Sequence, residues 1–272
     1  MAFPREIPKS QFFVAQWLAP GLLDTSAPEM TVNEEIRGFV RGLLAEPMEG
    51  RDWPPPPPEG TKVPAGMAWV PPGPFIYGEG QETKVVRLEQ GFFVARAPVT
   101  NGEYARFVEA TGHEPPQHWK GNIPPDELRD HPVAYASWRD AVAYAEWAGV
   151  RLLTEQEWEK AARGIDGRIY PWGDEFDSIR CNTAESSIGT TTPVHRYSPG
   201  GDSPCGCADM VGNVWEWTAG KWEAGSERRV VRGGSFYFGQ GYVRCAFRNG
   251  NFPDSRLADG GFRVMVASPV SL

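Results

Sequence analysis

The run WPPPPPEG, at residues 53–60, constrains the architecture of this chain more than any other stretch. Proline fixes φ and lacks an amide proton, so five prolines in succession exclude a helix and predict a stiff, extended spacer. The spacer divides the chain into an N-terminal part, residues 1–60, and a main domain, residues 61–272.

The segment before the spacer predicts one amphipathic helix within TVNEEIRGFVRGLLAEP. Thr31 and Glu34 are placed as a capping box, and the apolar residues that follow recur at helical spacing. Two alternatives stay open, because the helix can pack on the main domain or bind a partner. The apolar residues at helical spacing are Ile36, Phe39, Val40, Leu43 and Leu44.

The first ten residues, MAFPREIPKS, include Glu6, which does not fit the basic start of a signal peptide. No apolar run reaches the 18 or so residues that a membrane-spanning helix needs. We therefore expect a cytoplasmic protein with no membrane insertion, and we expect the apolar segment FFVAQWLAPGLL to dock on the domain.

The main domain begins with strand patterns and continues with three helix patterns. MAWVPPGPFIYG and KVVRLEQGFFVARAPVT alternate short apolar runs with turn residues, which is typical of strands. Capping boxes at Thr100 with Glu103 and at Thr154 with Glu157 start two helices, and Ser137 can cap the helix between them. Beyond the third helix, Gly, Pro, Asn and Ser punctuate short β-type runs. The pattern predicts an irregular, loop-rich α+β domain.

Charge and cysteine content exclude several classes of function. The net charge of −8 and the absence of clustered Lys and Arg argue against a nucleic-acid partner. The cysteines form no CxxC pair, so we expect reduced thiols rather than a disulfide framework or a zinc site. The four cysteines are Cys181, Cys205, Cys207 and Cys245.

Six phrases occur in a fixed order along the chain: HPVAYASWRDAVAYAEWAGVRLLTEQEWEKAARG, YPWGDEF, CNTAES, DMVGNVWEW, RVVRGGSF and GGFRV. Together they resemble the formylglycine-generating-enzyme family, from about residue 65 to residue 268. The resemblance implies a modified C-type-lectin-like fold.

The family's oxidases bind copper through two cysteine thiolates five residues apart. Cys245 matches the second position, but Gln240 stands at the first, and an amide cannot supply the soft anionic sulfur that selects Cu(I). Another branch of the family carries iron on a three-histidine motif in an added helical domain. The four histidines of this chain lack that spacing, so we expect neither copper nor iron and no catalytic residue. The alternative is a copper oxidase that acts on protein cysteine through Cys245.

A third branch of the family, the variable proteins of diversity-generating retroelements, matches the C-terminal residues in detail. This chain reads RVVRGGSF, then YFGQGYVRCAFRNGNFPDSR, then LADGGFRV, which implies a variable region at about 229–268. A reverse transcriptase alters adenines in a template rich in Asn codons in these systems. The positions that map to template Asn, and that the resemblance implies bind ligand, are Tyr237, Phe238, Gly239, Gly241, Tyr242, Phe247, Asn249, Gly250, Asn251, Phe252, Ser255, Leu257, Ala258 and Asp259.

Residue types at these fourteen positions agree with that origin. An AAC or AAT codon changed only at its adenines cannot become Lys, Glu, Gln, Met or Trp, and none of these stands there. The mixture of Tyr and Phe with Gly, Ser and Asn is that of a paratope. We expect a protein or other macromolecular ligand, and an exposed patch with Cys245 buried beneath or beside it. The five side chains expected to converge on this patch are Tyr237, Tyr242, Phe247, Phe252 and Leu257.

Arginines between the variable positions and on either side of them are expected to be invariant and to hold the loops through carbonyls and carboxylates. We call them the frame arginines: Arg232, Arg244, Arg248, Arg256 and Arg263.

Relatives also bind calcium at two loops, and oxygen-rich ligation suits this ion. Ser186 replaces a carboxylate in the first loop, and Glu216 of the second can instead form a buried salt bridge with a frame arginine. The positions implied in the second loop are Asp209, Gly212, Val214 and Glu216, and those in the first loop are Asn182, Thr183, Ser186 and Ile188.

Overall fold

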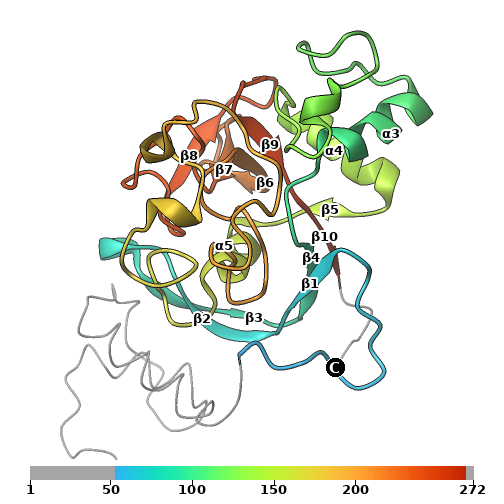
Figure 1. The fold of residues 1–272 in the computed structure, drawn as a ribbon. Helices are drawn as coiled ribbons and strands as arrows, with labels where there is room; N and C mark the ends of the chain where they lie inside the picture. Colours follow the sequence, from blue (N-terminus) through green and yellow to red (C-terminus); the bar gives the residue numbers. More distant parts are fainter. Residues whose placement is uncertain (1–52, 268–272) are drawn as a thin grey trace, which may run out of the picture.

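The structure, a computed structural model, describes residues 53–267. The helix predicted from Thr31 lies outside the described residues, so neither alternative for it is tested. Within the described part the domain has the expected α+β composition with three α-helices: the third lies among strands and irregular loops, and the first two lie at one edge of the molecule (Figure 1).

One antiparallel sheet joins the two ends of the described chain. Its strand order is β1-β4-β10-β5, so the last strand lies between two strands from the first half of the domain (Figure 1). The strands are β1 (Met67–Val70), β4 (Phe92–Ala95), β5 (Arg151–Leu152) and β10 (Val264–Ala267).

A second sheet positions the C-terminal loops, with strand order β8-β7-β6-β9. Its pairs are antiparallel except β6 with β9, which run parallel. A separate hairpin is formed by β2 and β3. These strands are β2 (Gly73–Tyr77), β3 (Lys84–Leu88), β6 (Trp215–Lys221), β7 (Arg229–Arg232), β8 (Arg248–Asn251) and β9 (Gly260–Phe262).

All three predicted helices are confirmed, and each begins with a complete capping box. They are α3 (Asn101–Thr111), α4 (Trp138–Ala148) and α5 (Glu155–Arg163). Gly112 and Gly149 follow α3 and α4 in the left-handed conformation, which glycine adopts without a Cβ penalty. Short 3-10 helices lie at Gly80–Glu82, Asp126–Leu128, Ser178–Arg180 and Ala184–Ser186.

Helix α5 packs between the β2–β3 hairpin and the β6–β7 strands. Its Trp158 is fully buried and belongs to one of two hydrophobic cores. The other core gathers aromatic side chains of α3, α4 and the second sheet, among them Trp215 and Trp217. Large aromatic side chains therefore fill much of both cores.

None of the helices among residues 53–267 combines the length and the apolar character that crossing a bilayer would need.

We expect Trp215→Ala to lower the free energy of unfolding by about 3 to 5 kcal/mol, because Trp215 is buried and its removal leaves a cavity. Trp147 provides a matched control, since its ring is 43% exposed on α4. Trp147→Ala should cost less than about 2 kcal/mol. Urea denaturation measures both values, and equal losses would contradict the assigned burial.

Candidate ligand-binding surface

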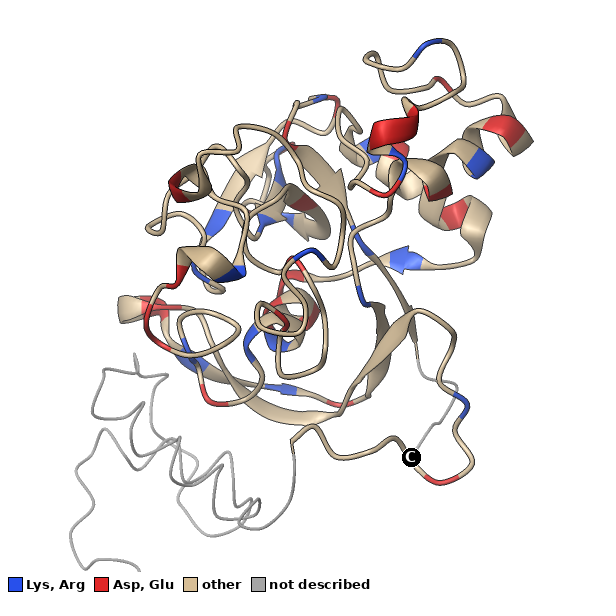
Figure 2. Cartoon of the chain, in the orientation of Figure 1, with Lys and Arg blue, Asp and Glu red and all other residues tan. Residues whose placement is uncertain are grey.

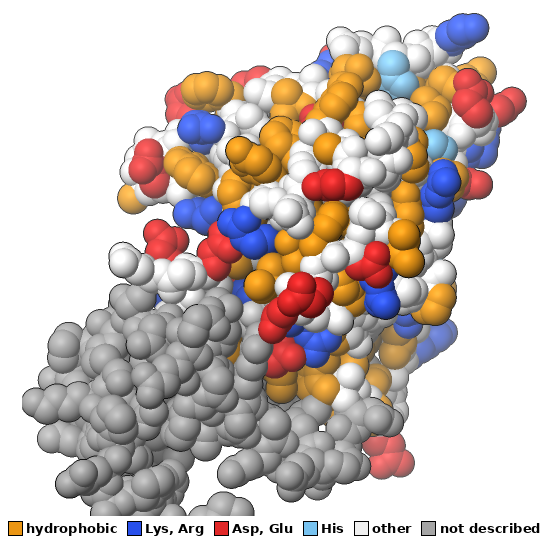
Figure 3. Space-filling view, turned by 60° about the vertical axis from the view of Figure 1, so that its left-hand side comes forward, with side chains coloured by type: hydrophobic (Ala, Val, Ile, Leu, Met, Phe, Trp, Pro, Cys, Tyr) orange, Lys and Arg blue, Asp and Glu red, His pale blue; other side chains and the backbone are white. Residues whose placement is uncertain are grey.

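The segment between β7 and β9 carries all fourteen predicted variable positions, on strand β8 and on the loops before and after it (Figure 1). Tyr237, Tyr242 and Phe252 are 59%, 52% and 60% exposed, which is unusual for large aromatic side chains. Figure 3 shows hydrophobic side chains gathered on the forward face of the molecule, interrupted by single charged groups.

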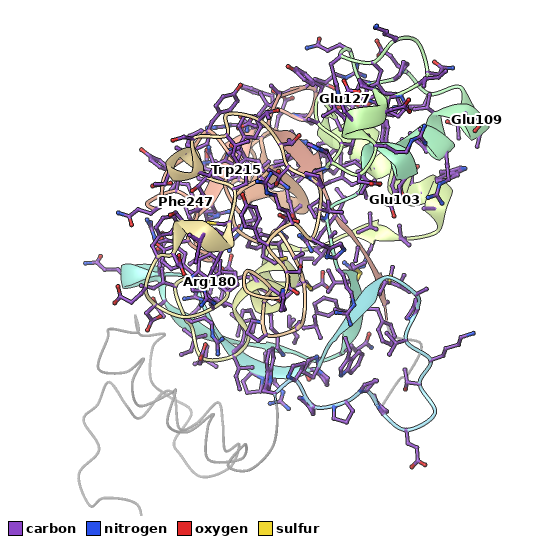
Figure 4. All side chains as sticks on the ribbon, in the orientation of Figure 1. Glu103, Glu109, Glu127, Arg180, Trp215 and Phe247 are labelled. Carbon is purple, nitrogen blue, oxygen red and sulfur yellow. The ribbon has the colours of Figure 1, made fainter. Side chains whose placement is uncertain are left out.

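Aromatic rings connect part of this surface to the core. Tyr242 contacts Phe238 and Phe247, with ring centroids 5.5 and 5.3 Å apart. Both of these half-buried rings also contact the buried Trp215, at 5.4 and 6.1 Å (Figure 4 labels Trp215 and Phe247). Tyr242 is therefore the outermost ring of a cluster of tilted and edge-on contacts, whereas Phe238 and Phe247 are partly exposed and partly packed on the core.

The five side chains that were expected to converge do not all belong to this aromatic cluster. Phe247 directly precedes β8 and Phe252 directly follows it, so the two residues lie roughly 15 Å apart along the strand. Leu257 is half-buried at the turn into β9. The described contacts support one cluster around Tyr242, with separate exposed aromatics at Phe252 and at Tyr237, whose ring contacts Phe236 at 4.2 Å.

The prediction that Gly250 and Asp259 are exposed is wrong, because both residues are buried. A Cβ at Gly250 would lie 2.8 Å from the indole of Trp222, so a side chain at this position has no room. The Asp259 carboxylate accepts a 2.6 Å hydrogen bond from Ser235, and its carbonyl accepts one from the Trp215 amide. Asp259 therefore belongs to the scaffold that holds β9 beside β6.

The other predicted positions lie at the surface to different degrees. Gly241 is exposed, and the half-buried ones are Gly239, Asn249, Asn251, Ser255 and Ala258.

The frame arginines bind as predicted. Arg232 is fully buried and donates to the Glu159 carboxylate at 2.5 Å and to the Cys245 carbonyl at 2.7 Å. It thereby joins β7 to α5 and to the variable segment. Arg263 donates to both oxygens of Glu216, at 2.7 and 2.8 Å.

The three outer frame arginines form bidentate or paired contacts with carboxylates of distant segments. Arg244 binds Glu79 through two nitrogens, at 2.7 and 2.9 Å, and the hydrogen bonds lower the pKa of that carboxyl. The other two pairs are Arg248 with Glu155 of α5 and Arg256 with Asp140 of α4.

Two residues that the sequence analysis did not single out also hold the loop at 237–242. Glu185 accepts from the Gln240 amide at 2.8 Å, and the Tyr170 hydroxyl donates to the Gln240 carbonyl at 3.3 Å. The neighbouring Ala184 amide donates to the Phe238 carbonyl at 3.1 Å. No sequence pattern signals these contacts, since they join segments more than 50 residues apart.

Cys245 is fully buried, as expected, and lies in the core that also contains Trp158. Burial raises the pKa of its thiol to about 12, so the thiolate is strongly disfavoured at neutral pH. Gln240, five residues earlier, is exposed. The residues at these two positions do not fit a copper site, because one supplies no sulfur and the other is a buried, protonated thiol.

The loops implied in calcium binding are joined to each other by Asn213. Its side chain donates to the Asp209 carboxylate and to the Thr192 carbonyl, and it accepts from the side-chain amide of Asn182. Ser186 donates to the Asn182 side chain at 3.0 Å. Calcium at these loops stays a prediction.

For Glu216 the geometry favours the salt-bridge alternative. Its two carboxylate oxygens accept from Arg263, and one of them also accepts from the Trp158 indole at 2.7 Å. A calcium ion at this carboxylate would have to share both oxygens with the Arg263 guanidinium, which carries the same sign of charge.

Comparisons with known proteins identify relatives in sequence and in fold. The family model of the sulfatase-modifying factor enzyme 1-like domain matches residues 55–268. The formylglycine-generating enzyme of Thermomonospora curvata is 33% identical over 74% of this chain and 93% of that protein. The inactive C-alpha-formylglycine-generating enzyme 2 of Bos taurus is 41% identical over 154 residues, which is 50% of each chain.

Treponema denticola variable protein 1, a solved structure, matches this fold with a TM-score of 0.61. The match covers 75% of this chain and 95% of that chain at 19% identity. At this identity the likeness establishes a shared fold. The chain is thus similar in sequence to enzymes and to an inactive relative, and in fold to a variable protein.

We predict opposite outcomes for two glycines of the variable segment. Gly241→Ser should leave the melting temperature nearly unchanged, because the nearest atom to a Cβ there is 3.8 Å away. Gly250→Ser should cost about 1 to 3 kcal/mol, because the side chain must displace the Trp222 ring. Thermal denaturation checks both, and equal tolerance would show that Gly250 is free to vary after all.

Asp209 should make stability depend on pH. Burial raises its pKa to about 6 from an ordinary value of 3.8, so the folded state holds this proton more tightly than the unfolded state does. Its contribution to stability is full below pH 4 and is lost as the pH rises through 6. At about 1.4 kcal/mol per pH unit, the loss is about 3 kcal/mol.

Urea denaturation between pH 4 and pH 7, in the presence of a chelator, should show this loss of unfolding free energy in the parent chain. The Asp209→Asn variant should not show it. Added calcium should abolish it if Asp209 is a ligand, because a bound cation stabilises the ionised carboxylate. An unchanged loss with calcium would contradict calcium binding at this residue.

Proposed function

The chain belongs to the sulfatase-modifying factor enzyme 1-like family, and we propose that it is a non-catalytic ligand-binding member whose C-terminal surface is diversified by a retroelement. The observation that carries the proposal is the way in which the scaffold holds the predicted variable segment.

Besides the frame arginines, scaffold residues bind this segment through its main chain. Glu185 and Tyr170 bind the amide and the carbonyl of Gln240, and Arg244 donates to the Gly241 carbonyl. Arg228 donates in the same way to the Gly250 carbonyl. Main-chain groups are present whatever the side chain, so these contacts persist when the side chains at the variable positions change.

Exposed aromatic side chains on this framework favour recognition of a macromolecule. Tyr237 and Tyr242 offer rigid contact area at a low entropic cost, and the glycines beside them leave space for a partner. Exposed aromatic residues of this kind are enriched at protein interfaces. The proposed ligand is therefore a protein or another macromolecule.

Catalysis by Cys245 is the second candidate, since the formylglycine-generating enzyme of Thermomonospora curvata is 33% identical to this chain. Two features count against it. The thiol is buried with a pKa raised to about 12, and Gln240 occupies the position of the partner cysteine. We therefore rank binding above oxidation.

Diversification makes a specific prediction about the gene. A near-repeat of the bases that encode residues 229–268 should lie nearby, beside a reverse-transcriptase gene, and should differ almost only at adenines. Sequencing the adjoining DNA checks this. A neighbourhood with neither feature would remove the retroelement from the proposal and leave ligand binding to be tested separately.

A copper-supplemented assay with a cysteine-containing sulfatase peptide tests the oxidase alternative. We expect no formylglycine above the level of a Cys245→Ser control, because a thiol without a second sulfur ligand cannot hold Cu(I) in the family's manner. Oxygen-dependent product that disappears in Cys245→Ser would falsify the non-catalytic proposal.

A further inference from the structure

We infer that three side chains at one end of the second sheet, Lys221, Arg229 and Asn251, bind a segment of a protein partner that is rich in Asp and Glu. We call these three residues the cross-strand row. The inference rests on the proposed function, because Asn251 is a predicted variable position. It adds two cationic residues that are not among the fourteen variable positions.

The register of the second sheet places the three residues side by side. Arg229 of β7 is the Cα partner of Lys221 on β6 and of Asn251 on β8. Directly opposite residues on antiparallel strands share a face of the sheet, with Cβ atoms about 5 Å apart. Lys221 is exposed and the other two are half-buried, so the row reaches solvent. Blue segments on the strands of this sheet mark its Lys and Arg residues (Figure 2).

The two cations of the row lack an acidic partner within the described residues. Each frame arginine pairs with a carboxylate, but neither Lys221 nor Arg229 forms a salt bridge within residues 53–267. Glu223 and Glu227 are exposed in the hairpin between β6 and β7 and form no salt bridge with the row. Like charges directly opposite destabilise a sheet, and such a local conflict is typical of functional sites. An anion bound between the two cations would remove the repulsion.

Trp138, the first residue of α4, holds the Arg229 side chain in place. The Arg229 guanidinium carbon lies 3.9 Å from the centre of the Trp138 ring, and Nη1 donates to the Ala219 carbonyl at 3.4 Å. Within the described residues this is the one hydrogen bond that the guanidinium donates, so further N–H groups are left for an anion. A guanidinium stacked on a ring is already oriented and loses little freedom when it binds a carboxylate.

The chain that follows Asn251 lies against the same tryptophan, because the Trp138 amide donates to the Pro253 carbonyl at 3.0 Å. Asp254, the next residue, is already paired with Arg139 at 2.6 Å. The row and the end of β8 therefore belong to one place on the surface, and the neighbouring aspartate does not neutralise the row.

The net charge of −8 does not prevent an acidic segment from binding here. Exposed charges more than about 8 Å apart are largely screened at physiological ionic strength, whereas the row presents two cations at one cross-strand spacing. A carboxylate can accept from both cations and from the Asn251 side-chain amide. A segment rich in Lys and Arg would be repelled. Asp and Glu are therefore the side chains that fit the row.

Asn251 would let diversification control this site. In an AAC or AAT codon, a change of the first adenine to guanine gives Asp. An aspartate directly opposite Arg229 would form the ion pair that the row otherwise leaves open. The predicted variable position would thus decide whether the two cations beside it are available to a ligand.

Panning a phage-displayed library of random dodecapeptides on the full-length chain tests the inference. We expect enriched peptides to be rich in Asp and Glu. Fluorescence anisotropy of the synthetic peptides should show roughly tenfold weaker binding to Asn251→Asp, because the new carboxylate occupies Arg229. Binding to Lys221→Gln should be roughly threefold weaker, because the ion pairs of an exposed lysine are screened.

Two control variants separate the charge of the row from other effects. Asn251→Ser removes the same amide without adding a charge and should weaken binding much less than Asn251→Asp does. Lys84→Gln removes an exposed lysine from β3 and should leave binding unchanged. None of these side chains is buried, so thermal denaturation should show that every variant folds like the parent chain.

The outcomes separate the row from the proposed function. Peptides that respond to Tyr242→Ser but not to Asn251→Asp and Lys221→Gln would overturn the inference and leave the proposed function standing. Peptides that respond to none of these three variants would overturn both. Equal losses for Asn251→Asp and Asn251→Ser, a loss for Lys84→Gln as well, or enrichment of peptides without an excess of Asp and Glu would overturn the inference alone.

Discussion

The buried guanidinium of Arg263 is the contact on which the arrangement of the domain depends. It donates to the Glu216 carboxylate of β6 and to the carbonyls of Ala95, Arg96 and Ala208. Burying a charge costs several kcal/mol, and only complete pairing offsets that cost. Because the partners come from β4, β6 and a loop, the ion pair is satisfied only when both four-stranded sheets are in place.

A second buried cluster extends this constraint to the C-terminal loops. Glu159 of α5 accepts from Arg163 and Arg232, and Arg232 also reaches the Cys245 carbonyl. Trp158, one residue before Glu159, donates to Glu216, so the two buried clusters meet at α5. The helix thus connects the inner scaffold to the segment that carries the predicted variable positions. The C-terminal loops are thus held by contacts to their main chain and by the frame arginines.

The same framework is compatible with catalysis or with binding, and local chemistry decides between them. Oxidation of the family's type requires accessible thiolates, whereas this chain encloses its single C-terminal thiol in an apolar core. Tyr237 and Tyr242, a few residues earlier in the sequence, are exposed to solvent. Relatives that are enzymes and a structural neighbour that is a variable protein therefore need not differ in fold, only in which groups reach the surface.

Local signals in the sequence determined the three helices and the loop-rich second half, because capping boxes and punctuating residues act over a few neighbouring positions. Ordered motifs indicated the family, and the resemblance to variable proteins implied a frame of arginines. Tertiary structure alone decided which carboxylate each arginine binds and that Glu216 pairs with Arg263, since these partners lie 47 to 165 residues apart. It also placed Gly250 against Trp222 and buried Asp259, because burial depends on what the rest of the chain packs onto a residue.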